Sequence, residues 1–569
     1  MTLQCLGNIR WRALSPLTLG RLAVLAMALN LALAAAPRAQ ATKDEFVIGL
    51  TQYPTPFHPL IGSMLAKSVI NNMATRPLTA YDKDWKLVCL LCTEVPTIEN
   101  GLAKVEEYAP GKKGIAVTYT IQANARWGDG TPVTTKDVLF TWEVGQAPLG
   151  GVTEQEGFRR TLKIDVIDDK KFTLHLDRIE YTYNVNDVRL LPAHLERTAF
   201  ADPREYKNRS KYETDTANPG LWNGPYRFAA VNPGSSIVLE PNPAWYGKKP
   251  HFKRITFKFI EKTAALEANL LSGSIDYILG ELGVTLDQAL EFQRRHSDRF
   301  NFIYRQSLTY EHIDLNLENP LLKDRRVRQA LLLGIDRESI NQKLFDGKQP
   351  VAHSNVHPLE PSFSDAAPRY GYDPKKAAAL LDAAGFSDIK NGIRHNKQGD
   401  RLSLDFVTTA GSRVRELVQQ VLQSQWKQIG VEMRLKPEPP RIFSSESLSK
   451  RLFTGLAMYA WISAPDGVPR STLHSKEIPT AANNWSGQNY PAFVNPEMDD
   501  VIDAMEIELD AAKRKALSAR MQKIYAEELP VLPLYNRSDP FILPKWLKGV
   551  EPTGTSYSST LWVEYWRAE

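Results

Sequence analysis

The sequence is poor in cysteine and contains none of the motifs that mark common catalytic sites. Only three of its 569 residues are cysteine. It has no G-x-S-x-G nucleophile elbow, no H-E-x-x-H zinc motif, no G-x-G-x-x-G dinucleotide fingerprint and no Walker loop. Its charged residues form no basic patch of the kind that binds nucleic acid. These absences argue against an enzyme and against a nucleic-acid partner.

The first 41 residues differ from the rest of the chain in composition. Basic residues precede an apolar run from Leu22 to Ala36, and an Ala-Gln-Ala site ends at Ala41. This arrangement is typical of a secretory signal peptide, and a run of about 15 residues is shorter than the roughly 20 that a spanning helix needs. An uncleaved membrane anchor is the alternative. We predict export and cleavage after Ala41, which removes four arginines and lowers the net charge from +5 to +1.

Two cysteines remain after this cleavage, Cys89 and Cys92 in the stretch VCLLCTE. An exported protein meets an oxidising compartment, which favours a local disulfide between them. A redox role stays open, and a zinc site would need two further ligands that no motif supplies. His353 and His357 have a spacing that suits metal ligands on a helix, but Pro350 and Pro358 beside them predict a loop. We therefore expect no metal and no cofactor.

The stretch ARWGDGTPVTTKDVLFTWE, residues 125–143, predicts a tight turn followed by a helix. Asp129 and Gly130 suit the turn, Thr134 suits the helix N-cap, and Asp137 follows three residues later as in a capping box. A phosphate-binding loop would need more glycines and usually a lysine at the helix start. The stretch is therefore interpreted as scaffold, with Val138, Leu139 and Trp142 forming the apolar face of its helix.

Further helices and strands alternate along the chain. Asp373, Asn495 and Asp336 are expected to cap helices, the first two with a proline at the next position. A last helix is predicted from about Ala511 to Glu527. Alternating apolar residues predict strands between these helices, for example in KFTLHLD and RITFKFIE. The sequence therefore predicts an α/β protein.

Aromatic residues and single charges gather near residue 460. The group comprises Tyr459, Trp461 and Trp485 with the charged residues Asp466 and Arg470. Such a mixture suits a cleft for a small amphipathic ligand. The alternative is that the aromatic side chains belong to the core and the charges face solvent.

Several stretches, in their order along the chain, resemble the extracellular solute-binding proteins of family 5. They include ARWGDGTPVTTKDVLFTWE, GPYRFAAVNPGSSIVLEPNPAWYGKKP, ALEANLLSGSIDY, DRRVRQALLLGIDRESI, YDPKKAAALLDAAGF and PVLPLYNRSDPFI. These proteins are the peptide- and nickel-type receptors of bacterial ABC transporters, and the resemblance covers nearly all of the mature chain.

The resemblance implies a two-lobed periplasmic-binding-protein fold of type II, similar to cluster C, with a small extra subdomain. The first lobe would span residues 42–309, with the subdomain at about 81–215, and the second lobe 310–530. Residues 531–569 would return to the first lobe. The lobes would close on a ligand about a hinge near Tyr310–Leu315 and Pro530–Leu534.

The resemblance also implies a periplasmic receptor without catalytic activity, cofactor, nucleotide or metal. Its partners would be a peptide or small-molecule ligand, permease subunits and, through them, cytoplasmic ATPases, and we expect a monomer. The substrate is expected to be a peptide or peptide-like solute. The alternatives are a polar metabolite such as an opine or amino sugar, an exported hydrolase, and a chaperone-like or sensory binding protein.

Peptide receptors of this family usually carry an aspartate three residues after the tryptophan that corresponds to Trp461. Here Ala464 stands at that spacing, and the next acid is Asp466. We expect Asp466 to accept from a cationic or amino group of the ligand and Arg470 to pair with a carboxylate.

Aromatic side chains would provide the remaining ligand contacts. Trp461 and Trp485 would stack on the ligand, and Tyr459 of the same group is also expected to bind it. Tyr53, with His58 behind it, would line the cleft from the first lobe, local packing being the alternative for both.

Overall fold

The computed structural model describes residues 43–569 except 63, 154, 440–441, 484–486 and 556. Among these residues, no helix combines the length and the apolar character that crossing a membrane requires. The strands of the principal sheet are β1 (Glu45–Leu50), β8 (Tyr226–Asn232), β9 (Ser236–Pro241), β10 (Arg254–Phe259), β11 (Tyr277–Ile278), β12 (Phe300–Leu315), β15 (Ser403–Thr409), β16 (Glu432–Glu438), β17 (Leu456–Ile462) and β18 (Val531–Pro544).

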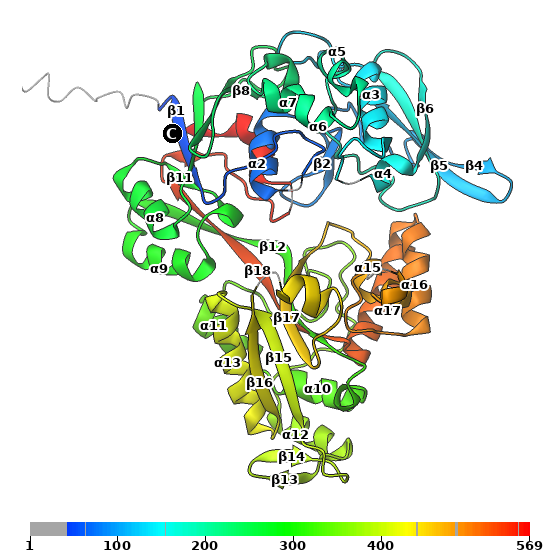
Figure 1. Cartoon of the computed structure of the whole chain (residues 1–569), viewed down its shortest axis with the longest axis vertical. Helices are drawn as coiled ribbons and strands as arrows, with labels where there is room; N and C mark the ends of the chain where they lie inside the picture. Colours follow the sequence, from blue (N-terminus) through cyan, green and yellow to red (C-terminus); the bar gives the residue numbers. More distant parts are fainter. Residues whose placement is uncertain (1–42, 63, 154, 440–441, 484–486, 556) are drawn as a thin grey trace, which may run out of the picture. The chain divides into compact units, whose positions relative to one another are not determined.

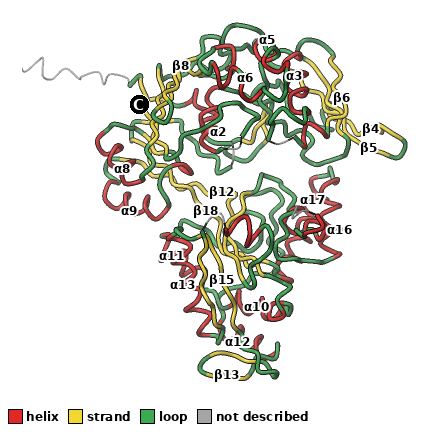
Figure 2. Tube along the Cα trace, viewed as in Figure 1, coloured by secondary structure: helices red, strands yellow, loops and turns green. Residues whose placement is uncertain are grey.

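The remaining elements are short strand groups and helices (Figures 1 and 2). The strands are β2 (Thr79–Tyr81), β3 (Leu87–Cys89), β4 (Ala103–Ala109), β5 (Lys112–Thr120), β6 (Thr161–Val166), β7 (Lys171–Leu176), β13 (Asp388–Lys390), β14 (Ile393–His395), β19 (Leu547–Lys548) and β20 (Arg567–Ala568). The helices are α2 (Leu65–Ala74), α3 (Thr135–Gln146), α4 (Glu156–Arg159), α5 (Ala193–Glu196), α6 (Tyr206–Arg209), α7 (Lys211–Thr214), α8 (Thr263–Ser272), α9 (Leu286–His296), α10 (Arg325–Leu333), α11 (Arg337–Phe345), α12 (Pro374–Ala383), α13 (Arg413–Gln428), α15 (Arg470–Leu473), α16 (Pro496–Ile507) and α17 (Ala511–Glu528).

One ten-stranded mixed sheet connects most of the described chain, in the order β16-β15-β17-β12-β18-β11-β1-β10-β9-β8. The pairs β1–β10, β1–β11, β15–β16 and β15–β17 are parallel, and the pairs of β12 with β17 and β18 are antiparallel. A separate antiparallel sheet has the order β4-β5-β7-β6. The predicted α/β class is confirmed.

Two large hydrophobic cores lie along the principal sheet. The first core draws on residues 46–282 and 541–566, and includes Trp127, Trp222 and Trp566. The second core draws on residues 286–535, and includes Phe406 and Trp426. The strands β12 and β18, which run side by side in Figure 1, contribute side chains near both cores.

The pairing of β12 with β18 is interrupted between Gln306 and Tyr310. In this gap the N–H of Leu308 donates instead to the carbonyl of Gly554 at 3.0 Å. Gly554 has φ +74°, and a Cβ there would lie 2.1 Å from the carbonyl oxygen of Gln306, so this close approach requires glycine. Of the segments expected to form the hinge, Tyr310–Leu315 begins where this gap ends and Pro530–Leu534 comes shortly before Asn536, the partner of Tyr310. Both segments contribute side chains to the second core.

A buried charge group joins the strand pair to a helix of the second core. Glu311 of β12 is fully buried. Its carboxylate accepts from Arg415 Nε of α13 at 2.6 Å and from Arg537 Nη2 of β18 at 2.5 Å. Burial alone would raise the pKa of Glu311, but the charges of Arg537 and Arg415 outweigh it and lower the pKa to about 2.

The predicted helix boundaries agree closely with the structure. Thr134 caps α3, and Asp137 Oδ2 accepts from the N–H of Thr134 at 2.9 Å. Asp373, Asn495 and Asp336 cap α12, α16 and α11 as expected. One detail is wrong: Leu139 is 41% exposed, because the buried side of α3 is formed by other residues, which include Val138 and Trp142.

Candidate ligand-binding site

A cavity of about 310 Å³ lies on one face of strands β12 and β17. Its lining includes Tyr310, His312 and Asp314 from β12 and Trp461 from β17. Side chains alternate along a strand, so these three residues of β12 share one face while Ile313 packs in the second core. Tyr310 pairs with Trp461 in the register of the two strands. The pleat of the sheet therefore places polar and aromatic side chains together on the cavity floor.

The polar groups of the floor are buried and their pKa values shift strongly. Tyr459 donates its hydroxyl to Asp314 Oδ2 at 2.5 Å. Burial raises the pKa of Asp314 to about 7, against the smaller opposite effect of this hydrogen bond. Burial lowers the pKa of His312 to about 4. At neutral pH the imidazole is therefore uncharged, and Asp314 gains or loses its proton readily.

A second carboxyl group lines the same cavity. Glu360 is 6% exposed, and its Oε1 accepts from the N–H of His357 at 2.8 Å. Burial raises the pKa of Glu360 to about 8 although this hydrogen bond favours the charged form, and the charge of Asp466 raises it further. The cavity thus holds two carboxyl groups that burial disfavours as anions.

The loop after β17 lines this cavity and a second one. In this loop the N–H of Gly467 donates to the carbonyl of Ala464 at 3.1 Å, and Asp466 has a left-handed φ of +59°. The carbonyl of Asp466 accepts from Arg514 of α17. The second cavity, of about 710 Å³, is lined by Asp466 and Arg514 and also by Tyr181 from the chain after β7. The loop therefore lies between α17 and the segment after β7, which are distant from each other in sequence.

Contacts near these cavities join segments that are far apart in the chain. The N–H of Tyr181 donates to the carbonyl of Glu506 at 3.1 Å, and the Arg514 guanidinium lies 3.8 Å from the centre of the Tyr181 ring. The ring of Trp85 packs edge-on against His357, with ring centres 5.1 Å apart. Residues of both predicted lobes therefore line the second cavity, whereas the described residues that line the first lie between Tyr310 and Val531.

The residues predicted to bind ligand do not all line one cavity. Trp461 and Ala464 line the first cavity, and Tyr459 lies beside His312 and Asp314 without lining it. Asp466 and Arg470 line the second cavity. Burial raises the pKa of Asp466, and the opposing charge of Arg514 does not reverse this shift.

Arg470 already has two acidic partners within the protein. Its Nε donates to Glu506 Oε1 at 2.7 Å, and its Nη2 pairs with Asp503 of α16. These ion pairs engage two edges of the guanidinium that was expected to meet a ligand carboxylate.

The remaining predicted residues lie apart from both cavities or outside the description. The Tyr53 ring packs edge-on against Phe259, with ring centres 4.8 Å apart, next to the first core. His58 is 1% exposed, and its Nε2 shares a hydrogen bond with the Tyr206 hydroxyl at 3.0 Å. Trp485 lies outside the described residues.

Sequence reasoning missed His312, Asp314 and Glu360. For the first two a signal existed, because TYEHIDL places Tyr310, His312 and Asp314 at alternate positions of a strand, where their side chains share one face. Glu360 stands in a loop, and no periodic pattern points to it.

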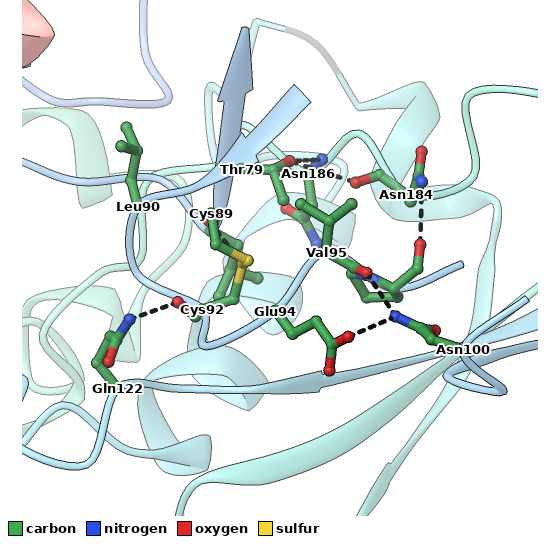
Figure 3. The surroundings of a disulfide bond; sticks show 12 residues. Thr79, Cys89, Leu90, Cys92, Glu94, Val95, Asn100, Gln122, Asn184 and Asn186 are labelled. Carbon is green, nitrogen blue, oxygen red and sulfur yellow. Dashed lines mark hydrogen bonds between the residues drawn. A yellow bond between two sulfur atoms is a disulfide. The ribbon is translucent and has the colours of Figure 1, made fainter. Parts of the chain in front are cut away.

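Cys89, at the end of β3, is bonded to Cys92, and their Cα atoms lie 5.1 Å apart (Figure 3). The carbonyl of Cys92 accepts from Gln122 Nε2 at 2.7 Å. Asn100 fixes the segment that follows by donating to the carbonyl of Val95 at 3.0 Å. The bond therefore closes a short loop within the first core. Within the described part of the chain, no group of three or more His, Cys, Asp or Glu side chains could hold a metal ion.

Comparison with known proteins places the chain in a family. Residues 97–481, more than half of the chain, match the family described as "Bacterial extracellular solute-binding proteins, family 5 Middle". The chain is 27% identical to the oligopeptide-binding protein AppA of Bacillus subtilis (strain 168) over 543 residues, which cover 91% of each sequence.

Solved structures give the same result. The oligopeptide-binding protein of Thermus thermophilus, crystallised with a pentapeptide, is 30% identical with a TM-score of 0.69, covering 92% of this chain and 96% of that one. NikZ of Campylobacter jejuni, in complex with Ni(L-His), shares the fold at 24% identity with a TM-score of 0.70, covering 92% and 99%. The chain therefore belongs to the bacterial extracellular solute-binding proteins of family 5, the non-catalytic substrate-binding components of ABC importers.

Proposed function

We propose that this protein captures a peptide or peptide-like solute in a cleft between two lobes and delivers it to a membrane permease that cytoplasmic ATPases drive. The names of the relatives support a peptide, since both AppA and the Thermus protein are called oligopeptide-binding. The lobes would be residues 42–309 with 531–569, and residues 310–530, with a small subdomain at about 81–215. Each lobe so defined contains most of one of the two hydrophobic cores.

One observation carries this proposal: the cavity beside Trp461 combines aromatic walls with a few buried polar groups. Small-molecule sites have this composition, in which apolar contact supplies affinity and polar groups supply orientation. Trp461 and Trp485 would stack on the ligand, and Tyr459, whose ring packs edge-on against that of Trp461, would hold the Trp461 ring in place. Asp466 would accept from an amino group.

Two of the proposed contacts require a change in the protein. Arg470 would have to exchange Asp503 or Glu506 for a ligand carboxylate. Tyr53 would have to leave its edge-on packing against Phe259 to contact the ligand. We therefore rank both below Trp461 and Asp466 as ligand contacts.

A second candidate is a receptor for a non-peptide polar metabolite such as an opine or amino sugar. Ala464 supports it, because this exposed residue lines the cavity where a peptide receptor of the family would carry an aspartate. A buried α-ammonium group without a carboxylate would cost several kcal/mol.

We further propose that the protein acts in the periplasm as a monomer, after removal of residues 1–41. The apolar run before Ala41 and the small residues at the site support cleavage there. N-terminal sequencing of the exported protein should begin at Thr42, and a sequence that begins before Leu22 would indicate a retained anchor.

Native mass spectrometry of the purified protein, before and after denaturation, tests the ligand class. Released masses that differ by amino-acid residues would support a peptide receptor. One defined non-peptide mass would support the second candidate and overturn the first. A protein without bound ligand would be titrated with a pentapeptide library, and failure to bind any pentapeptide would overturn the peptide proposal.

A further inference from the structure

The cavity beside Trp461 is lined by acidic side chains and by no basic ones among its described residues. Asp314 and Glu360 both line it, whereas none of its described lining residues is lysine or arginine. No lysine or arginine of the described chain lies within ion-pair distance of either carboxyl group. Arg514 influences Glu360 from farther away and donates its own hydrogen bonds to the carbonyls of Met505 and Asp466. The cavity thus supplies acidic groups without basic partners.

His312 adds an independent sign that a donor belongs in this cavity. The residue is 1% exposed, and its Nδ1 lies 3.1 Å from the carbonyl oxygen of Tyr310. A carbonyl only accepts, so Nδ1 carries the proton of the neutral ring and Nε2 presents a lone pair. Nε2 has no hydrogen-bond partner among the described residues, and Asp314 Oδ1 lies 3.5 Å from it.

The other unpartnered buried atom on the lining points to the same chemistry. Asn355 Oδ1 also lacks a hydrogen-bond partner within the described chain. The two buried unpartnered atoms of the described lining residues, Asn355 Oδ1 and His312 Nε2, are therefore both acceptors. Leaving buried polar atoms unsatisfied is unfavourable, and a ligand group with several N–H donors would satisfy them together.

The walls suit the same kind of group. Tyr310 and Trp461 face the cavity from paired positions of β12 and β17. The faces of aromatic rings attract cations, and this attraction is stronger where water is excluded. Carboxyl groups, a bare imidazole nitrogen and aromatic rings together form an environment for an organic cation.

We propose that this cavity receives a protonated amine or guanidinium group of the ligand, with Asp314 and Glu360 as counter-charges and His312 Nε2 as a further acceptor. The proposal rests on the proposed function, which it makes more specific, since it assigns the ligand a positive charge. The cation would come from a basic side chain of the ligand or, in place of the contact proposed for Asp466, from the ligand's own amino terminus.

Binding of matched pentapeptides by isothermal titration calorimetry tests the proposal. The set contains pentaalanine, pentaalanine with lysine at each position in turn, the same peptides with norleucine, and acetylated forms of all of them. Cadaverine and 1,5-pentanediol form a matched non-peptide pair. We expect the charged member of a pair to bind the wild-type protein at least about tenfold more tightly, as hydrogen bonds to a charged group do.

Two isosteric variants identify the residues that make the difference. Asp314→Asn keeps an acceptor for the Tyr459 hydroxyl, and Glu360→Gln keeps an acceptor for the N–H of His357. Each should reduce the preference for the charged member to less than about threefold while affinity for the neutral member is retained. Glu497→Gln removes one charge at an exposed ion pair with Arg520 and should change nothing.

The outcomes separate the possible sources of the cation. If the wild-type protein prefers lysine to norleucine and the variants lose this preference, the cation that binds in the cavity is a side chain. If it prefers only free peptides to acetylated ones, the cation is the amino terminus. If no pentapeptide binds but cadaverine does, with loss in the variants, the peptide function fails and the cation site stands. Equal affinity for charged and neutral members, a preference unchanged in both variants, or no binding of any probe would overturn the inference.

Discussion

Glu311 of β12 is a fully buried acidic residue that forms ion pairs with two arginines. Its carboxylate connects β12 to α13 through Arg415 and to β18 through Arg537. Moving charges out of water is costly, so a buried group of this kind is held by its partners and not by burial itself. The two arginines depend on the glutamate in turn.

Replacing Glu311 with glutamine should destabilise the protein by about 2–3 kcal/mol, because its buried side chain would lose the charge-assisted hydrogen bonds from the partly exposed Arg415 and Arg537. Urea unfolding at pH 7 measures the change. Glu497→Gln, which breaks an exposed ion pair with Arg520, should cost no more than about 1 kcal/mol. Equal stability of the two variants would contradict this role of Glu311.

The same residue predicts a pH window for stability. The pKa of Glu311 is about 2 in the folded protein, below its ordinary value of 4.5. A lowered pKa means that its contribution is complete above pH 4.5 and is lost as the pH falls toward 2, a change of about 3 kcal/mol. Unfolding free energies at pH 5, 4 and 3 should therefore converge for the wild type and Glu311→Gln. A constant difference across this range would contradict the assignment.

The sequence predicted the segment that holds part of the candidate site, around Trp461, but not the residues from other segments that line the same cavity. Trp461 was predicted because a tryptophan beside loop residues is conspicuous, whereas His312 and Asp314 looked like parts of a strand. Their importance depends on which face of β12 meets the cavity, and the pairing of β12 with β17 sets that face. The two strands are distant in sequence: Tyr459 and Asp314, which share a hydrogen bond, are 145 positions apart. Single-sequence patterns do not carry such pairings.

Helices and their caps were the elements most accessible to prediction. Asp373 before Pro374 and Asn495 before Pro496 satisfy orphan N–H groups within one turn, so their effect is local. The order of the ten strands was not predictable from propensity, since β11 and β18 are neighbours although they are far apart in sequence. The ordered family resemblance supplied the fold that local patterns did not.

Thr134→Ala tests whether the turn and cap before α3 are scaffold. Removing the capping hydroxyl should lower stability by about 1 kcal/mol, because an N–H in the first turn loses its acceptor. Affinity for the tightest-binding pentapeptide of the calorimetric set should stay unchanged, since Thr134 lines neither cavity beside the loop after β17. Thermal unfolding and calorimetry measure the two effects. A loss of affinity at equal stability would show that the stretch contacts ligand.

At the scale of the whole molecule, two cores are joined by strands that belong to both. The first core holds side chains from both ends of the described chain, and the second holds those between. A pair of semi-independent cores is suited to closing around a ligand, since each stays intact while the connection bends.

Small-angle X-ray scattering should therefore detect closure. With saturating amounts of the tightest-binding pentapeptide, we expect the radius of gyration to fall, because hinge closure draws the two lobes together. Trp461→Ala should need a higher peptide concentration for the same change. Scattering that stays constant while calorimetry reports saturation would contradict closure about the β12–β18 strand pair.

The strands β12 and β18, which connect the two cores, are hydrogen-bonded to each other and so form a two-stranded ribbon in place of two independent linkers. Rotation of one core must twist this ribbon, and the twist is least resisted where pairing lapses, between Gln306 and Tyr310. The ribbon would therefore guide each closing movement along the same arc and help the protein reopen once its cargo has left.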